Sequence, residues 1–213
     1  TGSRKTKLLN CKNNFVDLER LAQHRGSSFG HFKFAQPSPI DFENSLAISL
    51  LKAEEKSKTD FFENIWLEDE SRMIGHREIP ATLFAKMQSA ELFFVDVPLE
   101  ERIQNLLEDY LCEGNGINRL HPLSPEQADR LRDDFTRSLK AISKRLGGFA
   151  SKTLIENMEY AIEQHQRSEG FAHHEGWVRD LLNLYYDPIY ARHIEANKSR
   201  LVWRGDSSEF LKI

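Results

Sequence analysis

Short apolar runs alternate with longer amphipathic segments along most of the 213-residue chain. Runs of this length fit buried strands, whereas the segments between them carry apolar residues at helical spacing. The runs cover residues 14–18, 65–69, 92–97 and 201–204. Strands joined by helices predict an α/β fold with a mostly parallel sheet, in three layers. Because 39% of the residues are hydrophobic, the chain has material for one core, and we expect one domain.

Helix start signals fix the positions of several helices. Ser38 and Ser124 each precede a proline and have an acid or amide side chain three residues later, and Asp206 has Glu209 at that distance. Both arrangements are typical of capped helix N-termini. The helix after Ser124 should end at Gly147-Gly148. Helical periodicity fills most of residues 99–198, which predicts a large helical insertion before the last strand.

The first six residues, TGSRKT, resemble the second half of a phosphate-binding Walker A loop. In such a loop backbone N–H groups surround phosphate oxygens, a lysine adds positive charge, and the next hydroxyl can ligate Mg²⁺. We therefore predict that Gly2, Ser3, Lys5 and Thr6 bind phosphate. The alternative is a solvated first turn of a helix.

Two departures from the loop pattern affect this prediction. Arg4 stands where a glycine is expected just before the lysine, at a tight point of the loop. The loop's first glycine and the strand before it are missing from the chain. We therefore expect a P-loop domain over residues 1–213 that is incomplete at its N-terminus, with a marginal or altered fold.

Acidic residues lie at the ends of the first two apolar runs. Asp17 and Glu19 lie at or just after the end of the first run, and Glu68 and Glu70 at or just after the end of the second. Ligands of open α/β sheets bind at the carboxyl ends of strands, so these acids are candidates to hold a ligand hydroxyl or a metal-bound water. The alternatives are structural: Asp17 as a helix cap, and Arg72 as an ion-pair partner of the second pair.

Basic and hydroxyl side chains form two further candidate sets. The first set suits a phosphate of a ligand or of an RNA backbone: His24, Arg25, Ser27, Ser28 and Arg72. The second lies on the charged helix and is a candidate face for RNA: Lys140, Lys144 and Arg145. The alternatives are a solvated loop for the first set and an ordinary solvated helix surface for the second.

Composition excludes several classes of protein. The net charge of -4 argues against nucleic-acid binding by bulk charge, so any RNA contact must be local. The two cysteines, Cys11 and Cys112, lie far apart outside any CxxC pair, which argues against a disulfide framework or zinc site. No membrane span or signal peptide is apparent, so we expect a cytoplasmic protein.

Two conspicuous residue groups have ordinary interpretations. Cys11 and Cys112 fall in predicted helices, where small-residue packing explains them better than catalysis. His173 and His174 are adjacent, so their side chains point in different directions, and a polar loop is favoured over a metal site.

An ordered succession of motifs resembles tRNA 2-selenouridine synthase over essentially the whole chain. The segment VDLERLAQHRGSSFG at 16–30 carries the signature. It is followed by QPS at 36–38, FEN at 42–44, EDESR at 68–72 with IG at 74–75 and IP at 79–80, VPLEER at 97–102, YYDP at 185–188 and RGD at 204–206.

The resemblance implies an enzyme in which an N-terminal rhodanese-like domain with the catalytic cysteine precedes a P-loop domain similar to this chain. It implies action on the wobble uridine of the tRNA anticodon region, where selenium from selenophosphate replaces the sulfur of 2-thiouridine, with a geranylated thiouridine intermediate made from geranyl diphosphate. No catalytic residue and no tightly bound cofactor would then lie here, Mg²⁺ aside, and the chain alone would be inactive.

The residues alone leave two other functions open. A P-loop, strand-end acids and a helical insertion also suit a small-molecule kinase or NTPase. The second of these functions is that of a non-catalytic nucleotide- or RNA-binding module.

Overall fold

The computed structural model describes residues 1–26, 29, 35–58, 64–168 and 170–213. It divides into two compact units, each considered by itself: unit 1 comprises residues 1–3 and 97–196, and unit 2 comprises residues 4–96 and 197–213.

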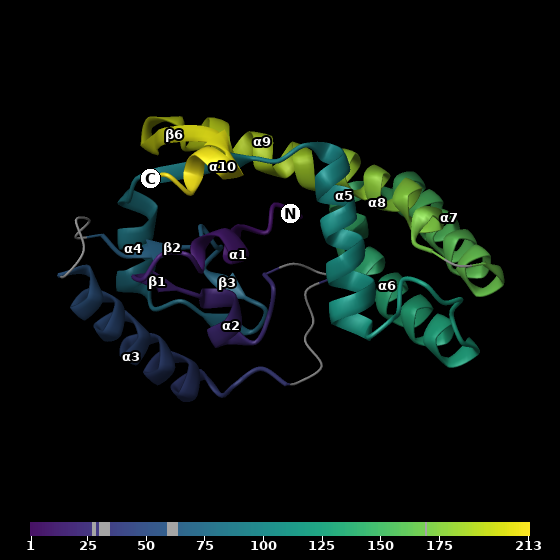
Figure 1. Ribbon diagram of the computed structural model, residues 1–213, viewed down its shortest axis with the longest axis horizontal. Helices are drawn as coiled ribbons and strands as arrows, with labels where there is room; N and C mark the ends of the chain where they lie inside the picture. The colour runs from purple at the N-terminus through teal and green to yellow at the C-terminus, as the bar shows by residue number, and fades with distance from the viewer. Residues whose placement is uncertain (27–28, 30–34, 59–63, 169) are drawn as a thin grey trace. The chain divides into compact units, whose positions relative to one another are not determined.

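Unit 2 combines short strands with helices (Figure 1). Its helices are α1 (Lys5–Leu9), α2 (Leu18–Ala22), α3 (Pro39–Ser57), α4 (Ala81–Ser89), η4 (Lys198–Arg200) and α10 (Ser207–Phe210). Its strands are β1 (Phe15–Val16), β2 (Trp66–Leu67), β3 (Met73–Ile74), β4 (Arg77–Glu78), β5 (Leu92–Asp96) and β6 (Leu201–Asp206). β1 pairs with β2 and β5 with β6 in parallel, while β3 and β4 form an antiparallel pair.

The mixture of helices and parallel strand pairs agrees with the predicted α/β class. Each predicted strand overlaps an observed one, although β1 and β2 are only two residues long and β6 extends two residues beyond the predicted run. Within the described residues the strands form separate two-stranded sheets. One continuous sheet in three layers therefore stays a prediction.

The core of unit 2 lies between α3 and β1. Ser38 caps α3 by accepting a hydrogen bond from Asp41 N, and Phe42 and Leu46 are buried one turn apart on the same face. They belong to a cluster with Val16 and Leu18. Burial of each such side chain contributes about 1.5–3 kcal/mol. This packing holds the end of β1, and with it the start of α2, in a fixed place.

Aromatic side chains connect the two parallel strand pairs of unit 2. The Trp66 ring of β2 lies edge-on to Phe93 of β5 at 4.9 Å and to Phe210 of α10 at 5.5 Å. Trp203 of β6 stacks on Phe93 at 6.2 Å. Such contacts add about 0.5–1.5 kcal/mol each beyond burial, so β2 is tied to β5 and β6 by side chains.

Unit 1 is helical. It contains α5 (Leu99–Leu107), η1 (Glu108–Glu113), α6 (Pro125–Leu146), α7 (Gly148–Arg167), η2 (Ala172–His174), α8 (Glu175–Leu181), η3 (Leu182–Tyr186) and α9 (Asp187–Ala196). Contacts between α6 and α7 and between α7 and α8 place these helices side by side (Figure 1). Leu131, Leu139 and Trp177 are buried, and the Phe135 ring of α6 lies 5.2 Å from the Trp177 ring of α8.

The ends of the helices in unit 1 are confirmed in part. Ser124 caps α6 in a full capping box with Gln127, and Gly147 ends that helix at φ 91°. The expected end of this helix at Gly147-Gly148 is confirmed, and α7 begins directly after it, with Gly148 as its first residue. Within the region expected to be helical, α5 and α8 are each continued by a π-helical turn, η1 and η3.

The predicted polar loop at His173-His174 is wrong. His174 is fully buried, its Nδ1 accepts from Trp177 Nε1 at 3.1 Å, and its Nε2 lies 3.0 Å from His165 Nδ1. A neutral His174 must therefore carry its proton on Nε2 and donate to His165. Burial lowers the pKa of His174 to about 3, and it also lowers the pKa of His165. Both rings are core components that are held neutral.

The packing expected for the cysteines is also wrong for one of them. Cys11 is exposed and lies in a turn after α1, not in a helix. Cys112 is half-buried in η1, and burial raises the pKa of its thiol. In the described part of the chain, no helix is both long enough and apolar enough to cross a membrane.

Candidate phosphate-binding site

Lys5 and Thr6, at the start of α1, meet the acids that follow β2. The Lys5 ammonium contacts the carboxylate of Glu70 and lies 3.7 Å from Glu19 Oε1. The Thr6 hydroxyl donates to Glu68. β1 and α1 adjoin in the chain and β2 pairs with β1, so strand pairing brings the acids to Lys5. The candidate site consists of Lys5, Thr6, Glu19, Glu68 and Glu70.

Burial governs the ionisation of these acids. Glu68 is 1% exposed, and its Oε2 accepts from the backbone N–H of Glu19 at 3.4 Å. Burial raises the pKa of Glu19 to about 8; Lys5 opposes this shift, and the neighbouring carboxylates Glu68 and Glu70 add to it. Burial also raises the pKa of Glu68. Glu19 is therefore mostly protonated at neutral pH, which limits the repulsion of an anionic ligand.

Asp17 caps a helix, as the structural alternative for this residue predicted. Its carboxylate caps α2, accepting from the backbone N–H of Arg20 at 2.8 Å. The same carboxylate lies 3.8 Å from Arg20 Nε. These contacts orient α2 and hence Glu19, the second residue of that helix.

Arg4 adopts the backbone conformation that glycine favours. Its φ is 51° and its ψ 34°, the left-handed region. The prediction that a glycine belongs before Lys5 thus matches the local geometry, because a side chain is strained there.

Gly2 and Ser3 belong to unit 1, where their surroundings explain the glycine. Gly2 has φ +77°, and a Cβ on it would lie 2.8 Å from Arg102 O. Its carbonyl accepts from Asn105 Nδ2 at 2.8 Å. Only glycine fits both the conformation and the close approach of α5.

The basic cluster after α2 is described in part. His24 is buried, with Nδ1 accepting from Gly26 N at 3.1 Å, and Arg25 is half-buried. Ser27 and Ser28 lie outside the described residues. A Cβ on Gly26, which has φ +64°, would overlap the Glu70 carboxylate. The chain after His24 therefore passes directly beside the candidate site.

Gln36 is a positioning residue that residue-type reasoning did not single out. Its Nε2 donates to Ala22 O at 2.8 Å and Ile74 O at 2.9 Å, and its Oε1 accepts from His76 N at 2.7 Å. One amide thus joins the end of α2 to the β3–β4 turn. The only sequence signal was its place in the QPS motif.

Arg72 does not pair with Glu68 or Glu70, as one alternative had it. It forms an ion pair with Glu78 across the β3–β4 hairpin, and both side chains are about half exposed. Exposed pairs of this kind contribute about 0–1 kcal/mol. Arg72 remains accessible as a candidate phosphate contact.

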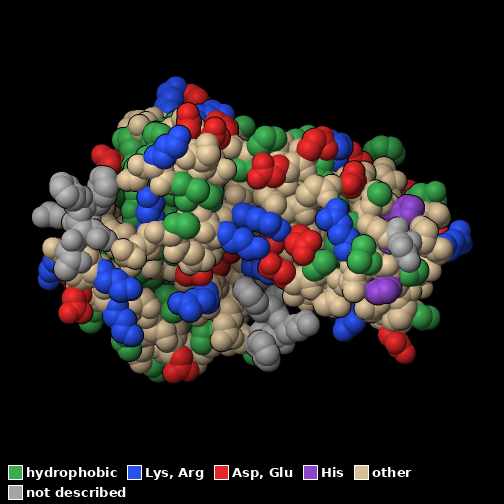
Figure 2. Space-filling model, in the orientation of Figure 1, with side chains coloured by type: hydrophobic (Ala, Val, Ile, Leu, Met, Phe, Trp, Pro, Cys, Tyr) green, Lys and Arg blue, Asp and Glu red, His purple; other side chains and the backbone are tan. Residues whose placement is uncertain are grey.

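The candidate tRNA face on α6 is exposed. Lys140, Lys144 and Arg145 all lie on the solvent side of the helix. Earlier on α6, Arg132 and Arg137 pair with Asp129 and Asp134. On the face drawn in Figure 2, basic and acidic side chains are likewise interspersed. Among the described residues, no three or more His, Cys, Asp or Glu side chains are grouped to hold a metal.

Comparison with known proteins gives a consistent result. Residues 1–213 match the family model described as "tRNA 2-selenouridine synthase AAA domain". The tRNA 2-selenouridine synthase of Pseudomonas putida (strain W619) is 39% identical over 211 residues, which are 98% of this chain and 56% of the relative. The protein of the same name from Hahella chejuensis is 40% identical over 210 residues, which are 54% of that relative. The one from Shewanella frigidimarina is 38% identical over 208 residues, which are 55% of that relative. The chain thus spans little more than half the length of these relatives. No solved structure matches it.

Proposed function

The chain belongs to the family of tRNA 2-selenouridine synthase AAA domains, and we propose that it is the phosphate-binding part of an enzyme that makes 2-selenouridine in tRNA. The observation that carries the proposal is the meeting of Lys5 and Thr6 with Glu68 and Glu70. A lysine, a hydroxyl and strand-end acids are the groups with which P-loop proteins hold phosphates and Mg²⁺.

The proposed ligands are the two phosphorylated donors of this modification, selenophosphate and geranyl diphosphate. Both are anions, and Lys5 supplies the positive charge for a phosphate. Because Lys5 is engaged by Glu70, a bound phosphate must displace or share that contact. Glu19, protonated at neutral pH, adds little repulsion. Mg²⁺, if used, would be held between Thr6 and Glu68.

The proposed substrate is 2-thiouridine at the wobble position. In the proposed reaction the uridine sulfur displaces diphosphate from geranyl diphosphate, and the selenium of selenophosphate then displaces the geranylated sulfur as geranyl thiolate. Hydrolysis of the Se–P bond releases phosphate. In this scheme the chain holds the donor, and Lys5 stabilises the negative charge that develops on diphosphate as it leaves. The step at the family's cysteine is assigned to no residue of this chain.

Two other functions compete with this proposal. A kinase or NTPase is favoured by the same contacts of Lys5 and Thr6, since these suit a nucleoside triphosphate equally well. A non-catalytic module is favoured by the strained Arg4 next to Lys5.

Direct titration separates these functions. The full chain is titrated with geranyl diphosphate, selenophosphate, ATP and a thiolated tRNA anticodon stem-loop, with Lys5→Ala as the reference variant. Binding of a donor and of the stem-loop, with donor binding lost in Lys5→Ala, supports the proposal. ATP hydrolysis without binding of the stem-loop would favour the kinase, and binding of ATP or RNA without any donor would favour the module.

A further inference from the structure

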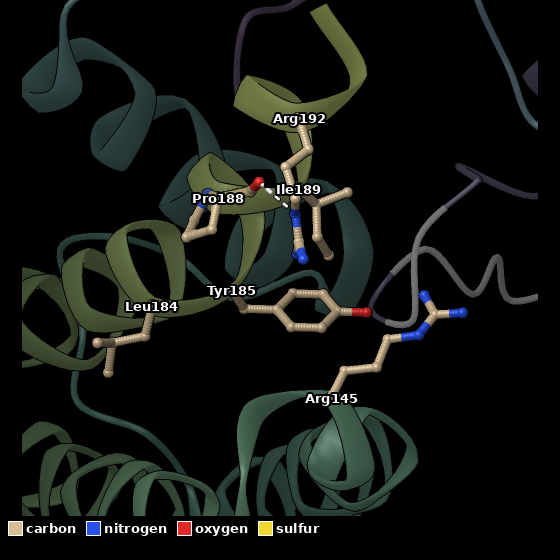
Figure 3. Close-up of a pocket in the computed structure, with 6 residues that line it drawn as sticks. All are labelled: Arg145, Leu184, Tyr185, Pro188, Ile189 and Arg192. Atoms are coloured by element: carbon tan, nitrogen blue, oxygen red, sulfur yellow. Dashed lines mark hydrogen bonds between the residues drawn. The ribbon is translucent and has the colours of Figure 1, made fainter. Parts of the chain in front are cut away.

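Unit 1 contains a hollow of about 430 Å³ between α6, η3 and α9. Pockets for small molecules typically measure about 300–1,000 Å³, so the hollow has room for one compact group. Its lining comes from three segments: Arg145, Leu184, Tyr185, Pro188, Ile189 and Arg192 (Figure 3).

The lining combines an aromatic and apolar wall with two positive charges. Figure 3 shows the Tyr185 ring extending from η3 between Arg145, from α6, and Arg192, from α9. Leu184, Pro188 and Ile189 complete the apolar part. Leu184 is 53% exposed, so the hollow opens to solvent. A ligand that matches this lining has a flat or apolar body and an anionic group.

The two arginines are available to an anion. Within the described part of unit 1, neither Arg145 nor Arg192 forms an ion pair, whereas Arg102 and Arg179 pair with Asp187 and Glu100. Arg192 Nε donates to Pro188 O at 3.0 Å, which orients the guanidinium and leaves its terminal nitrogens for a ligand. Guanidinium groups in such a position favour phosphate oxygens.

The backbone under Tyr185 is itself unusual. η3 is a π-helical turn between α8 and α9, and Tyr185 is its fourth residue. Turns of this kind are rare and occur frequently at functional sites. Tyr185 is 9% exposed and lies against Tyr186, with ring centroids 5.0 Å apart, so its ring has a fixed position.

We propose that this hollow holds one unstacked nucleotide of the tRNA, with its base against the accessible edge of Tyr185 and the exposed Leu184, and its phosphate between Arg145 and Arg192. Single-stranded RNA is commonly recognised through bases held against aromatic side chains, with arginines on the backbone. The inference rests on the proposed function, because it identifies where the tRNA of that reaction is held.

The lysines before Arg145 favour RNA over a free small molecule. Lys140 and Lys144 are exposed on the same helix, and residues 140–145 span about 7.5 Å along its axis. A chain of phosphates can use positive charge both inside and beside the hollow, whereas a single donor molecule fills only the hollow. In this proposal the RNA phosphates next to the bound nucleotide contact Lys140 and Lys144, and Arg145 contacts the phosphate at the hollow.

The test measures binding of a labelled anticodon stem-loop to the full chain by fluorescence anisotropy at several salt concentrations. Arg145→Gln and Arg192→Gln should each weaken binding about 5- to 30-fold and reduce the salt slope by about 1. Tyr185→Leu should weaken binding by a similar factor with an unchanged salt slope, and Tyr185→Phe should keep wild-type affinity. Matched controls on α7 are Arg167→Gln and Tyr160→Leu, both at exposed positions outside the hollow.

Three outcomes of this experiment would contradict the inference. If both arginine variants bind the stem-loop with wild-type affinity and salt slope, while donor binding still depends on Lys5, the hollow does not bind tRNA but the proposed function stands. If the arginine variants lose geranyl diphosphate instead of RNA, the hollow is a donor site. If the wild-type chain binds neither RNA nor donor, the inference and the proposed function both fail. Since the arginines are exposed, circular dichroism of these variants should match wild type.

Discussion

The Thr6 hydroxyl donates a hydrogen bond to Glu68, 62 residues away in the chain. This contact ties the first turn of α1 to the acid that follows β2, and Lys5 and Glu70 form a second contact beside it. The parallel pairing of β1 with β2 makes both possible. The candidate site is therefore assembled by the core of unit 2, and its properties should respond to changes in that core and in its buried charges.

Glu19 should make the stability of the chain fall as pH rises. Its pKa is about 8 in the folded chain and ordinarily 4.5, so between these values the unfolded chain releases a proton that the folded chain retains. The contribution of Glu19 to the free energy of unfolding must then decrease from about pH 4.5 to about pH 8. Glu19→Gln should remove part of this slope and be more stable than wild type at pH 8 by at least about 1.4 kcal/mol, the equivalent of one pKa unit.

Urea unfolding at pH 5, 6.5 and 8 measures this effect. Glu43→Gln, at an exposed position of α3, is the control and should keep the wild-type slope. An identical slope in wild type and Glu19→Gln would mean that Glu19 ionises normally.

The buried histidines of unit 1 should produce the opposite trend at lower pH. The pKa of His174 is about 3 in the folded chain and ordinarily 6.5. Between these values the unfolded chain binds a proton that the folded chain does not bind. The free energy of unfolding should drop as pH falls from about 6.5 towards 3, by up to about 1.4 kcal/mol per pH unit for each such histidine.

Replacing His174 tests the origin of that trend. His174→Gln should flatten the acid slope while costing about 1–3 kcal/mol at pH 7, because Trp177 Nε1 loses its acceptor. The exposed His76 provides the control, and His76→Gln should leave the curve unchanged. A wild-type acid slope in His174→Gln would assign the effect to other groups.

Replacing Arg4 with glycine should relieve backbone strain. The left-handed conformation costs a non-glycine residue roughly 1–2 kcal/mol. Glycine avoids this cost, but it loses more conformational entropy on folding, which offsets part of the gain. We expect Arg4→Gly to raise the free energy of unfolding by about 0.5–1 kcal/mol, and Lys7→Gly, inside α1, to lower it by about 1 kcal/mol. Chemical denaturation distinguishes the two; a loss of stability in Arg4→Gly would show that the arginine side chain outweighs the strain.

Gly75 should tolerate no side chain. It has φ +61°, and a Cβ there would overlap Gln36 Oε1, which holds the β3–β4 turn. Gly147 also has positive φ, +91°, but nothing lies within 4 Å of its Cβ position. Gly75→Ala should therefore cost about 1–3 kcal/mol more than Gly147→Ala, since overpacking is added to conformational strain. Equal losses in thermal unfolding would refute the role given to Gln36.

Local signals were the part of the fold that could be predicted. The caps at Ser38, Ser124 and Asp206 all form, because each depends on side chains within three residues. Strand-end acids were predictable for a related reason: neighbouring parallel strands end at the same edge, so Glu68 and Glu70 had to approach the segment after β1.

Contacts that depend on tertiary packing were not predictable. His174 looked polar in its local sequence, and only the distant His165 and nearby Trp177 provide the partners that let it be buried. The pairing of Arg72 with Glu78 depends on a hairpin with strands of two residues, too short to give a periodic signal. The π-helical turns and the hollow at Tyr185 likewise depend on how helices pack against one another. A local sequence pattern does not predict that packing.

The most direct test of the phosphate-binding site is calorimetric titration of the chain with geranyl diphosphate, comparing wild type, Lys5→Ala and Lys7→Ala. Lys7 lies on the same short helix and is exposed, so its variant controls for the loss of a positive charge. If Lys5 holds the phosphate, Lys5→Ala should weaken binding by at least about 10-fold and Lys7→Ala by less than about twofold. Equal affinity of all three proteins for geranyl diphosphate would contradict the account.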